Sequence, residues 1–292
     1  MNGDIDIFKR PVDEECDRFV GKYGDTLYHY TSISTLVGIL EKGELWFSSS
    51  SSMNDMSESV FFLDSLIDAL TERLGNVYLH KIEEVSQLLH NELTTHYPFI
   101  MSLTLLKEDA AQWERYATDA KGICIGFNSR TMKEVFQGEL FQEVFYEFDI
   151  TKHKHFENLL EYITKGTTGD FYTSDGGPNL TGLINNIVIT ANLYKHSSFR
   201  AEQEIRLCPL IHYLTGNPRI EFKQVRGVIR KVCIIDIKEK CLKANVNFED
   251  LFNAILIGPR SQQNIFELGD FIKSLGYNKL ARKIAASKCP LR

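Results

Sequence analysis

Two glutamates stand two residues apart in the segment FRAEQEIRL, which spans residues 199–207. If this segment is a strand, its side chains alternate, and one face carries four charged residues: Arg200, Glu202, Glu204 and Arg206. Neighbouring arginines favour ionised carboxylates, and a fixed carboxylate can stabilise positive charge in a transition state. A second carboxylate about 7 Å along the strand can orient or deprotonate a nucleophile. The pattern predicts a catalytic pair, with a solvated and mutually neutralised face as the alternative.

Two further segments place polar side chains where predicted strands end. TLYHYTS carries His29, Tyr30 and Thr31 into a turn, and LWFSSSSSMNDMSE leads from a strand to Ser48 and Asn54. Taken separately, a histidine between aromatic residues is usually packed in a core, and the serine run is a turn with a helix cap. Imidazole and hydroxyl groups can also bond ribose hydroxyls, so these residues are candidates for ligand binding.

The elements that would position these side chains are predicted in mixed order. Strand patterns are scattered among helix patterns with little βαβ alternation, which favours an α+β fold built on largely antiparallel sheet. A helix is expected between Ser32 or Ser34 and Gly43, and Trp113 with Tyr116 is expected to pack in a core. No linker divides the chain, so residues 1–292 are read as one domain with a helical insertion roughly at 150–198.

Composition and missing motifs narrow the function classes. Hydrophobic residues at 43% and charged residues at 25% are ordinary for a globular protein. No apolar run reaches the roughly 18–20 residues that span a membrane, and the acidic start lacks a signal-peptide layout, so a cytoplasmic protein is expected. The signatures of P-loop enzymes, Rossmann enzymes, zincins and common serine hydrolases are missing. No cysteine cluster suits a metal, and His153 and His155 are expected on a solvated helix face.

The order of the segments HYTS, LWFS, ND..E, W..YA....G..IGF, E.E.R and IGP resembles an uncharacterised bacterial family, domain of unknown function 2971. The resemblance runs from about Tyr28 to Arg292. That family in turn looks similar to the ADP-ribosyltransferase superfamily. It implies an ADP-ribosyltransferase-like α+β fold, with a largely antiparallel split β-sheet core and surrounding helices.

The resemblance also implies an activity and a site. The expected reaction cleaves the nicotinamide–ribose bond of NAD, the substrate, and transfers ADP-ribose to an unidentified acceptor, protein or nucleic acid. Glu204 takes the catalytic position with Glu202 beside it, Gln203 lies beneath the sheet, and the residues implied to bind NAD are His29, Tyr30, Thr31, Ser48, Asn54 and Arg206. No metal and no membrane are implied.

The biological roles of similar families suggest a toxin or an anti-phage defence effector, with an antitoxin or a defence-system protein as partner. Two alternatives stay open. One is a glycohydrolase of NAD(P) or a related nucleotide on the same scaffold. The other is a non-catalytic domain that senses a ligand or binds a partner.

Overall fold

The structure is a computed structural model that describes residues 11–50, 56–95, 98–146, 150–152, 154–209, 219–225 and 227–291. Its strands form a 10-stranded sheet: β1 (Thr26–Thr31), β2 (Glu44–Ser49), β3 (Phe99–Thr104), β4 (Ile123–Asn128), β5 (Leu140–Glu143), β6 (Glu204–Cys208), β7 (Arg219–Val225), β8 (Val228–Asp236), β9 (Phe252–Ile257) and β10 (Ile284–Ala286). Every pair of these strands is antiparallel except β9 with β10. The predicted α+β class with a mostly antiparallel sheet is therefore confirmed.

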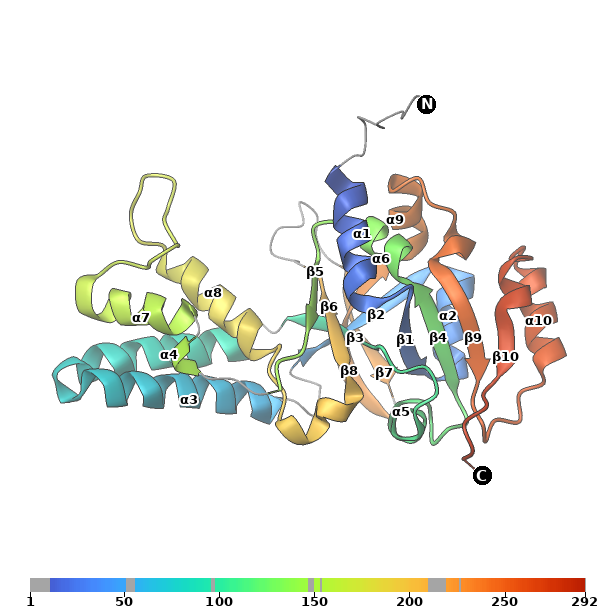
Figure 1. The fold of residues 1–292 in the computed structure, drawn as a ribbon, viewed down its shortest axis with the longest axis horizontal. Helices are drawn as coiled ribbons and strands as arrows, with labels where there is room; N and C mark the ends of the chain where they lie inside the picture. Colours follow the sequence, from blue (N-terminus) through green and yellow to red (C-terminus); the bar gives the residue numbers. More distant parts are fainter. Residues whose placement is uncertain are drawn as a thin grey trace, which may run out of the picture.

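The helices fall into two groups, which Figure 1 shows side by side. Helices on the sheet are α1 (Pro11–Tyr23), α2 (Ile33–Lys42), α5 (Ala110–Tyr116), α6 (Ser129–Val135), α9 (Ile237–Lys243) and α10 (Ile265–Ser274). The lobe at the left of the figure consists of α3 (Met56–Leu74), α4 (Leu79–Thr95), α7 (Lys154–Lys165) and α8 (Leu180–Ala191), which share a separate apolar core. The predicted insertion at 150–198 holds α7 and α8.

Helix α2 has the ends that its sequence predicts. The hydroxyl of Ser32 accepts a hydrogen bond from the backbone N–H of Thr35, which satisfies one donor of the first turn. Gly43 follows the last turn with φ 71°, a left-handed conformation that glycine adopts at low cost. The loop from β1 to β2 is therefore fixed by local chemistry at both helix ends.

The two faces of the sheet differ in character. The core face packs against helices and carries buried apolar side chains, including Leu27, Phe47, Leu103, Ile125 and Ile205. The opposite face, called here the ionic face, carries Tyr28, Ser102, Thr104 and Glu204. Registers fix this division, because Tyr28 lies opposite Thr104 and Thr104 opposite Glu204, and paired residues point to the same side.

Strands β1 and β2 both pair with the same edge of β3, β1 near its end and β2 near its start. Tyr28 of β1 lies opposite Thr104, whereas Ser48 of β2 lies opposite Ile100. Backbone hydrogen bonds alternate between the two edges of a strand. The N–H of Leu105 bonds toward β6 (to Gln203 O, 3.4 Å), so the even-numbered residues of β3 direct their backbone groups to the other edge, where β1 and β2 pair. The sheet therefore forks beside Ser102.

Candidate functional site

A buried ionic cluster lies at the start of β6 on the ionic face. The ammonium of Lys195 lies 2.8 Å from Glu202 Oε2 and 3.0 Å from Glu204 Oε2. Arg206 Nε donates to Glu204 Oε1 at 2.9 Å. Each of these residues is 6% exposed or less. Glu202, Glu204 and Arg206, which the sequence singled out together, thus meet in the structure around a shared lysine.

Glu202 forms the solvent-facing end of the cluster. Its Oε1 accepts hydrogen bonds from Arg115 Nη1 at 2.8 Å and from the hydroxyl of Tyr116 at 3.0 Å. The Arg115 side chain is 52% exposed, in contrast to the buried carboxylate. The ring of Phe199 lies 5.0 Å from the Lys195 ammonium and 5.8 Å from the Arg115 guanidinium. A polar ligand could therefore approach Glu202 from the side of Arg115.

The local backbone differs from the predicted strand. Ser197–Glu202 forms a 3-10 helix (η4), in which the His196 imidazole accepts from the N–H of Ser198, and β6 begins only at Glu204. Gln203, between them, has φ 44° and is exposed, so its predicted place beneath the sheet is wrong. Arg200 is exposed as well and does not share the buried face. The left-handed turn at Gln203 interrupts the alternation and directs Glu202 back toward Glu204.

The cluster also joins β6 to the end of the helical lobe. Lys195 donates its N–H to the carbonyl oxygen of Phe145 at 2.9 Å. The guanidinium of Arg206 donates through Nη1 to the carbonyl oxygen of Asn192, which follows α8 directly. The hydroxyl of Tyr146 accepts from the N–H of Glu204 at 2.9 Å. Backbone contacts thus hold the lysine that the sequence analysis did not identify.

The protonation of the cluster follows from its partners. Burial alone would raise the pKa of Glu204, but the charges of Arg206 and Lys195 and hydrogen bonds from Arg206 and Ser102 outweigh it and lower the pKa to about 2. Burial raises the pKa of Tyr116 far above neutrality, and Glu202 adds to this effect. At neutral pH Glu204 is therefore ionised, and Tyr116 keeps the proton that it donates to Glu202.

His29 and Thr31 lie on the core face and not beside the carboxylates. His29 pairs with Ile125 and Thr31 with Ile123, and both isoleucines belong to the main core. The imidazole Nδ1 of His29 lies 2.9 Å from the carbonyl oxygen of Ser102, at the fork between β1 and β2. Since that oxygen accepts the bond, Nδ1 carries the hydrogen. His29 therefore ties β1 to β3 where their backbones separate.

The remaining predicted residues have separate surroundings. Tyr30 is buried, and its hydroxyl lies 2.9 and 2.6 Å from the carbonyl oxygens of Leu106 and Lys107, which share its one hydrogen. Ser48 is half-buried on the ionic face, opposite Ile100. Asn54 lies outside the described residues. The structure thus brings three of the predicted site residues, Glu202, Glu204 and Arg206, into one cluster through Lys195, and it adds Arg115 and Tyr116. Tyr116 belongs to the W..YA motif, whereas no sequence signal pointed to Lys195.

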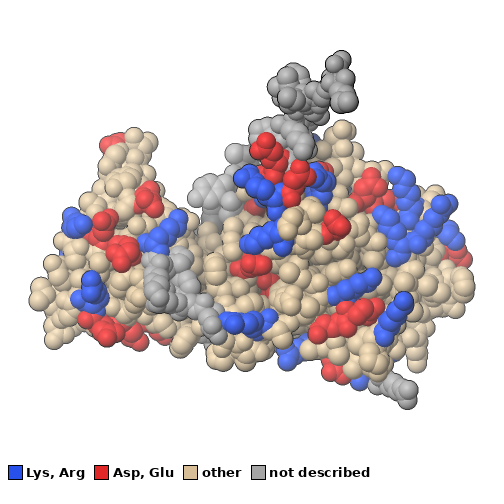
Figure 2. All heavy atoms as spheres, in the orientation of Figure 1, with Lys and Arg blue, Asp and Glu red and all other residues tan. Residues whose placement is uncertain are grey.

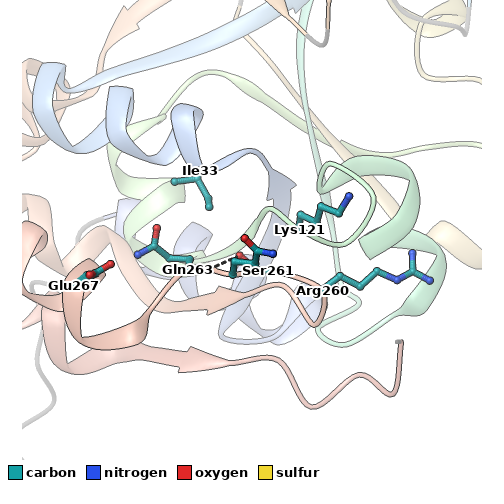
Figure 3. A pocket seen from close by; sticks show the side chains of 7 residues that line it. Ile33, Lys121, Arg260, Ser261, Gln263 and Glu267 are labelled. Atoms are coloured by element: carbon teal, nitrogen blue, oxygen red, sulfur yellow. Dashed lines mark hydrogen bonds between the residues drawn. The ribbon is translucent and has the colours of Figure 1, made fainter.

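A cavity of about 570 Å³ with mostly polar lining residues opens near the C-terminal end of α5 (Figure 3). Its lining residues are Ile33, Lys121, Arg260, Ser261, Gln262, Gln263 and Glu267. Arg260 Nη1 lies 2.8 Å from Asp119 and its Nη2 lies 3.1 Å from Glu114, so its charge is already balanced. Glu114 and Arg115 are adjacent, so α5 lies between this cavity and the ionic cluster. None of the predicted site residues lines the cavity.

Two further observations concern metals and membranes. His155 is 4% exposed and its Nε2 lies 3.0 Å from Thr190 Oγ1, so the predicted solvated position is wrong, and His153 lies outside the described residues. Within the described ranges, no cluster of three or more His, Cys, Asp and Glu side chains could hold a metal ion. Within the same ranges, no helix has the length and apolar character needed to cross a membrane.

Comparison with known proteins gives one partial match. Residues 112–207 match a family described as Protein of unknown function (DUF2971). No curated protein and no solved structure matches the chain. The matched segment runs from α5 to β6 and contains every side chain of the ionic cluster, from Arg115 to Arg206. Over this segment the chain is similar to a family of unknown function.

Proposed function

We propose that the chain is an NAD-dependent, ADP-ribosyltransferase-like enzyme that cleaves the nicotinamide–ribose bond and transfers ADP-ribose to an acceptor macromolecule. The observation that best supports this proposal is the carboxylate pair Glu202 and Glu204, held at the start of β6 beside cations and aromatic rings. Cleavage of that bond develops positive charge on the ribose, which a fixed and ionised carboxylate stabilises. The lowered pKa of Glu204 keeps it in the required state at neutral pH.

The two carboxylates take different roles in this proposal. Glu204, which two buried cations hold, supplies the fixed negative charge. Glu202 is the carboxylate that the ligand reaches, because its partner Arg115 is 52% exposed. Arg115 leaves Glu202 on binding and pairs with the dinucleotide phosphates, a geometry that guanidinium groups favour. Released from Arg115, Glu202 can orient or deprotonate the acceptor. The rings of Tyr116 and Phe199 offer stacking surfaces for a flat base.

His29 acts at a distance from the ligand in this proposal. Its imidazole holds the carbonyl oxygen of Ser102, and the Ser102 hydroxyl bonds Glu204. His29 is thus a positioning residue for the carboxylate on the opposite face. Ser48 shares the ionic face and is the predicted hydroxyl nearest the fork on β2.

A second candidate is a non-catalytic domain that binds a ligand or a partner. The observation that favours it is the saturation of both carboxylates: Glu204 is 5% exposed and bonds Lys195 and Arg206, and Glu202 bonds Lys195, Arg115 and Tyr116. In this alternative, the network has a structural role alone, which is to hold the lobe against the sheet. A glycohydrolase differs from the transferase in its acceptor, which is water.

The deciding experiment incubates the purified protein with NAD labelled in its adenylate group, with and without cell lysate, and follows released nicotinamide and the label. A transferase moves the label to a macromolecule, and a glycohydrolase releases ADP-ribose without lysate. Glu204→Gln is expected to lower nicotinamide release on the order of 10²-fold. Glu202→Gln is expected to impair transfer more than hydrolysis. An exposed glutamate, changed as Glu84→Gln, serves as the control.

Melting temperatures measured with and without NAD separate the remaining candidate functions. Wild-type protein that releases no nicotinamide, yet melts at a higher temperature with NAD, supports the non-catalytic domain. Loss of that NAD-dependent shift in His29→Ala, with Arg115→Ala unaffected, places the ligand at the fork and not beside Glu202.

A further inference from the structure

Strand β7 ends the hydrogen-bonded path of the sheet with an apolar and exposed surface. Among the described residues, β7 pairs with β8 alone. Ile220 is 40% exposed, Phe222 73% and, on β8, Ile229 78%. The register places Ile220 opposite Cys233 and Gln224 opposite Ile229, so these apolar side chains share one face. Lys231, opposite Phe222, and Gln224 lie on the same face. Exposed apolar side chains gathered on an outer strand are typical of an interaction surface.

The other face of β7 carries charges of alternating sign. Arg219, Glu221 and Lys223 follow one another at every second residue, and Glu221 forms ion pairs with both neighbours. Outer strands that avoid partners often carry charged side chains, lysine above all, which repel a second strand. In β7 a central acid stands between two bases. Such an order is complementary to itself when the strand runs in the opposite direction.

We propose that β7 pairs antiparallel with β7 of a second copy of the chain, with Phe222 at the twofold axis. In this register Glu221 lies opposite Lys223 of the other copy, and the same pair recurs across the axis. The two Phe222 rings meet, and Ile220 lies opposite Gln224. Opposite charges and aromatic pairs directly across an antiparallel ladder stabilise it. This inference does not depend on the proposed enzymatic activity.

The backbone of the hairpin agrees with this register. Val225 and Val228 pair with each other across a two-residue connection, so they exchange their backbone hydrogen bonds. Because bonding alternates along a strand, Ile220, Phe222 and Gln224 direct their backbone groups to the open edge. These are the residues that the proposed register pairs with one another, so each finds donors and acceptors on the second copy.

Neighbouring registers are excluded by charge. A pairing centred on Glu221 places the two glutamates opposite each other and Arg219 opposite Lys223. A pairing centred on Lys223 places the two lysines opposite each other. Like charges directly opposite destabilise a ladder. The register centred on Phe222 brings acids to bases along the middle of the strand. A register centred on Ile220 also pairs Glu221 with Arg219, but it leaves Phe222, Lys223 and Gln224 opposite positions that precede β7. An anionic polymer such as nucleic acid fits less well, because Glu221 lies in the middle of the strand.

The test is a charge exchange followed by analytical ultracentrifugation over a range of protein concentrations. The wild type is expected to associate reversibly to a dimer. Glu221→Lys and Lys223→Glu are each expected to weaken dimerisation about tenfold or more, because each places like charges opposite each other twice. The double variant, which exchanges the two residues, is expected to dimerise like the wild type. A mixture of the two single variants is expected to form a heterodimer, since their charges complement each other.

Several results would overturn the proposal. The proposal is wrong if the wild type stays monomeric at every concentration. It is also wrong if the single variants dimerise like the wild type. A monomeric wild type that binds labelled DNA through the hairpin assigns this surface to nucleic acid instead. Unchanged circular dichroism and melting temperatures show that the variants fold. Phe222→Ser provides a second variant and is expected to weaken dimerisation, because the two Phe222 rings meet at the twofold axis. It should leave the monomer folded, because a residue that is 73% exposed contributes little to monomer stability.

Discussion

The Nε atom of Arg206 lies 2.9 Å from Glu204 Oε1, and both side chains are buried. The two residues stand two apart on β6 and therefore point to the same side of the sheet. A buried ion pair gains little net stability, because removing both charges from water costs about as much as their attraction returns. Removing one partner is costly, because the other is left buried and unpaired. Because of this asymmetry, variants that remove one charged partner should show a measurable loss of unfolding free energy.

Glu204→Gln is expected to destabilise the protein by about 3 kcal/mol, because Arg206 and Lys195 lose a buried counter-charge. Urea denaturation at neutral pH measures the change in the free energy of unfolding. Glu84→Gln, at an exposed position on α4, is the matched control and is expected to change it by less than about 0.5 kcal/mol. Equal stability of the two variants would show that the cluster does not hold the fold.

The contribution of Glu204 is expected to depend on pH. In the unfolded chain this carboxyl titrates near its ordinary pKa of 4.5, whereas the folded protein holds the pKa at about 2. The stabilisation is therefore fully present above 4.5 and is lost as the pH falls toward 2. The difference in unfolding free energy between wild type and Glu204→Gln should shrink over this interval. A difference that stays constant from pH 5 to the acid limit contradicts this assignment.

Lys195→Met is expected to destabilise the protein, because it leaves Glu202 and Glu204 facing each other without the cation that they share. The double variant Lys195→Met with Glu204→Gln removes one charge of each sign. Its loss of stability is expected to fall short of the sum of the single losses by about 1–3 kcal/mol. Additive losses in a double-mutant cycle would mean that the two residues do not interact.

Gly122→Ala is expected to destabilise the protein by about 3 kcal/mol or more, because an added Cβ would lie 2.2 Å from the carbonyl oxygen of Thr31. That oxygen belongs to the backbone and cannot move without shifting β1. Gly38→Ala, in the middle of α2, meets nothing within 4 Å and is expected to stabilise by about 0.5–1 kcal/mol. Opposite signs in thermal or urea denaturation confirm the pair. A neutral Gly122→Ala contradicts the close approach.

The sequence predicted those features that depend on near neighbours. Helix α2 begins at Ser32 and ends at Gly43 because a hydroxyl and a missing side chain solve the problem of unpaired helix ends locally. Alternating apolar residues predicted the strands that face the core, and the mixture of elements predicted the fold class. The prediction of Tyr116 as a core residue was incomplete: the ring is half-buried, but its hydroxyl donates to Glu202.

Only the tertiary structure decided which polar side chains meet. The pattern FRAEQEIRL predicted one charged strand face, but a left-handed residue at Gln203 changed the path of the chain, and no residue type announces that turn by itself. Lys195 reached the carboxylates because its segment pairs with Phe145, a contact set by the packing of the lobe on the sheet. His29 faced the core because registers across β4 and β3 fix its side. Local propensity acts over a few residues, whereas the neutralisation of a buried charge needs partners from distant segments.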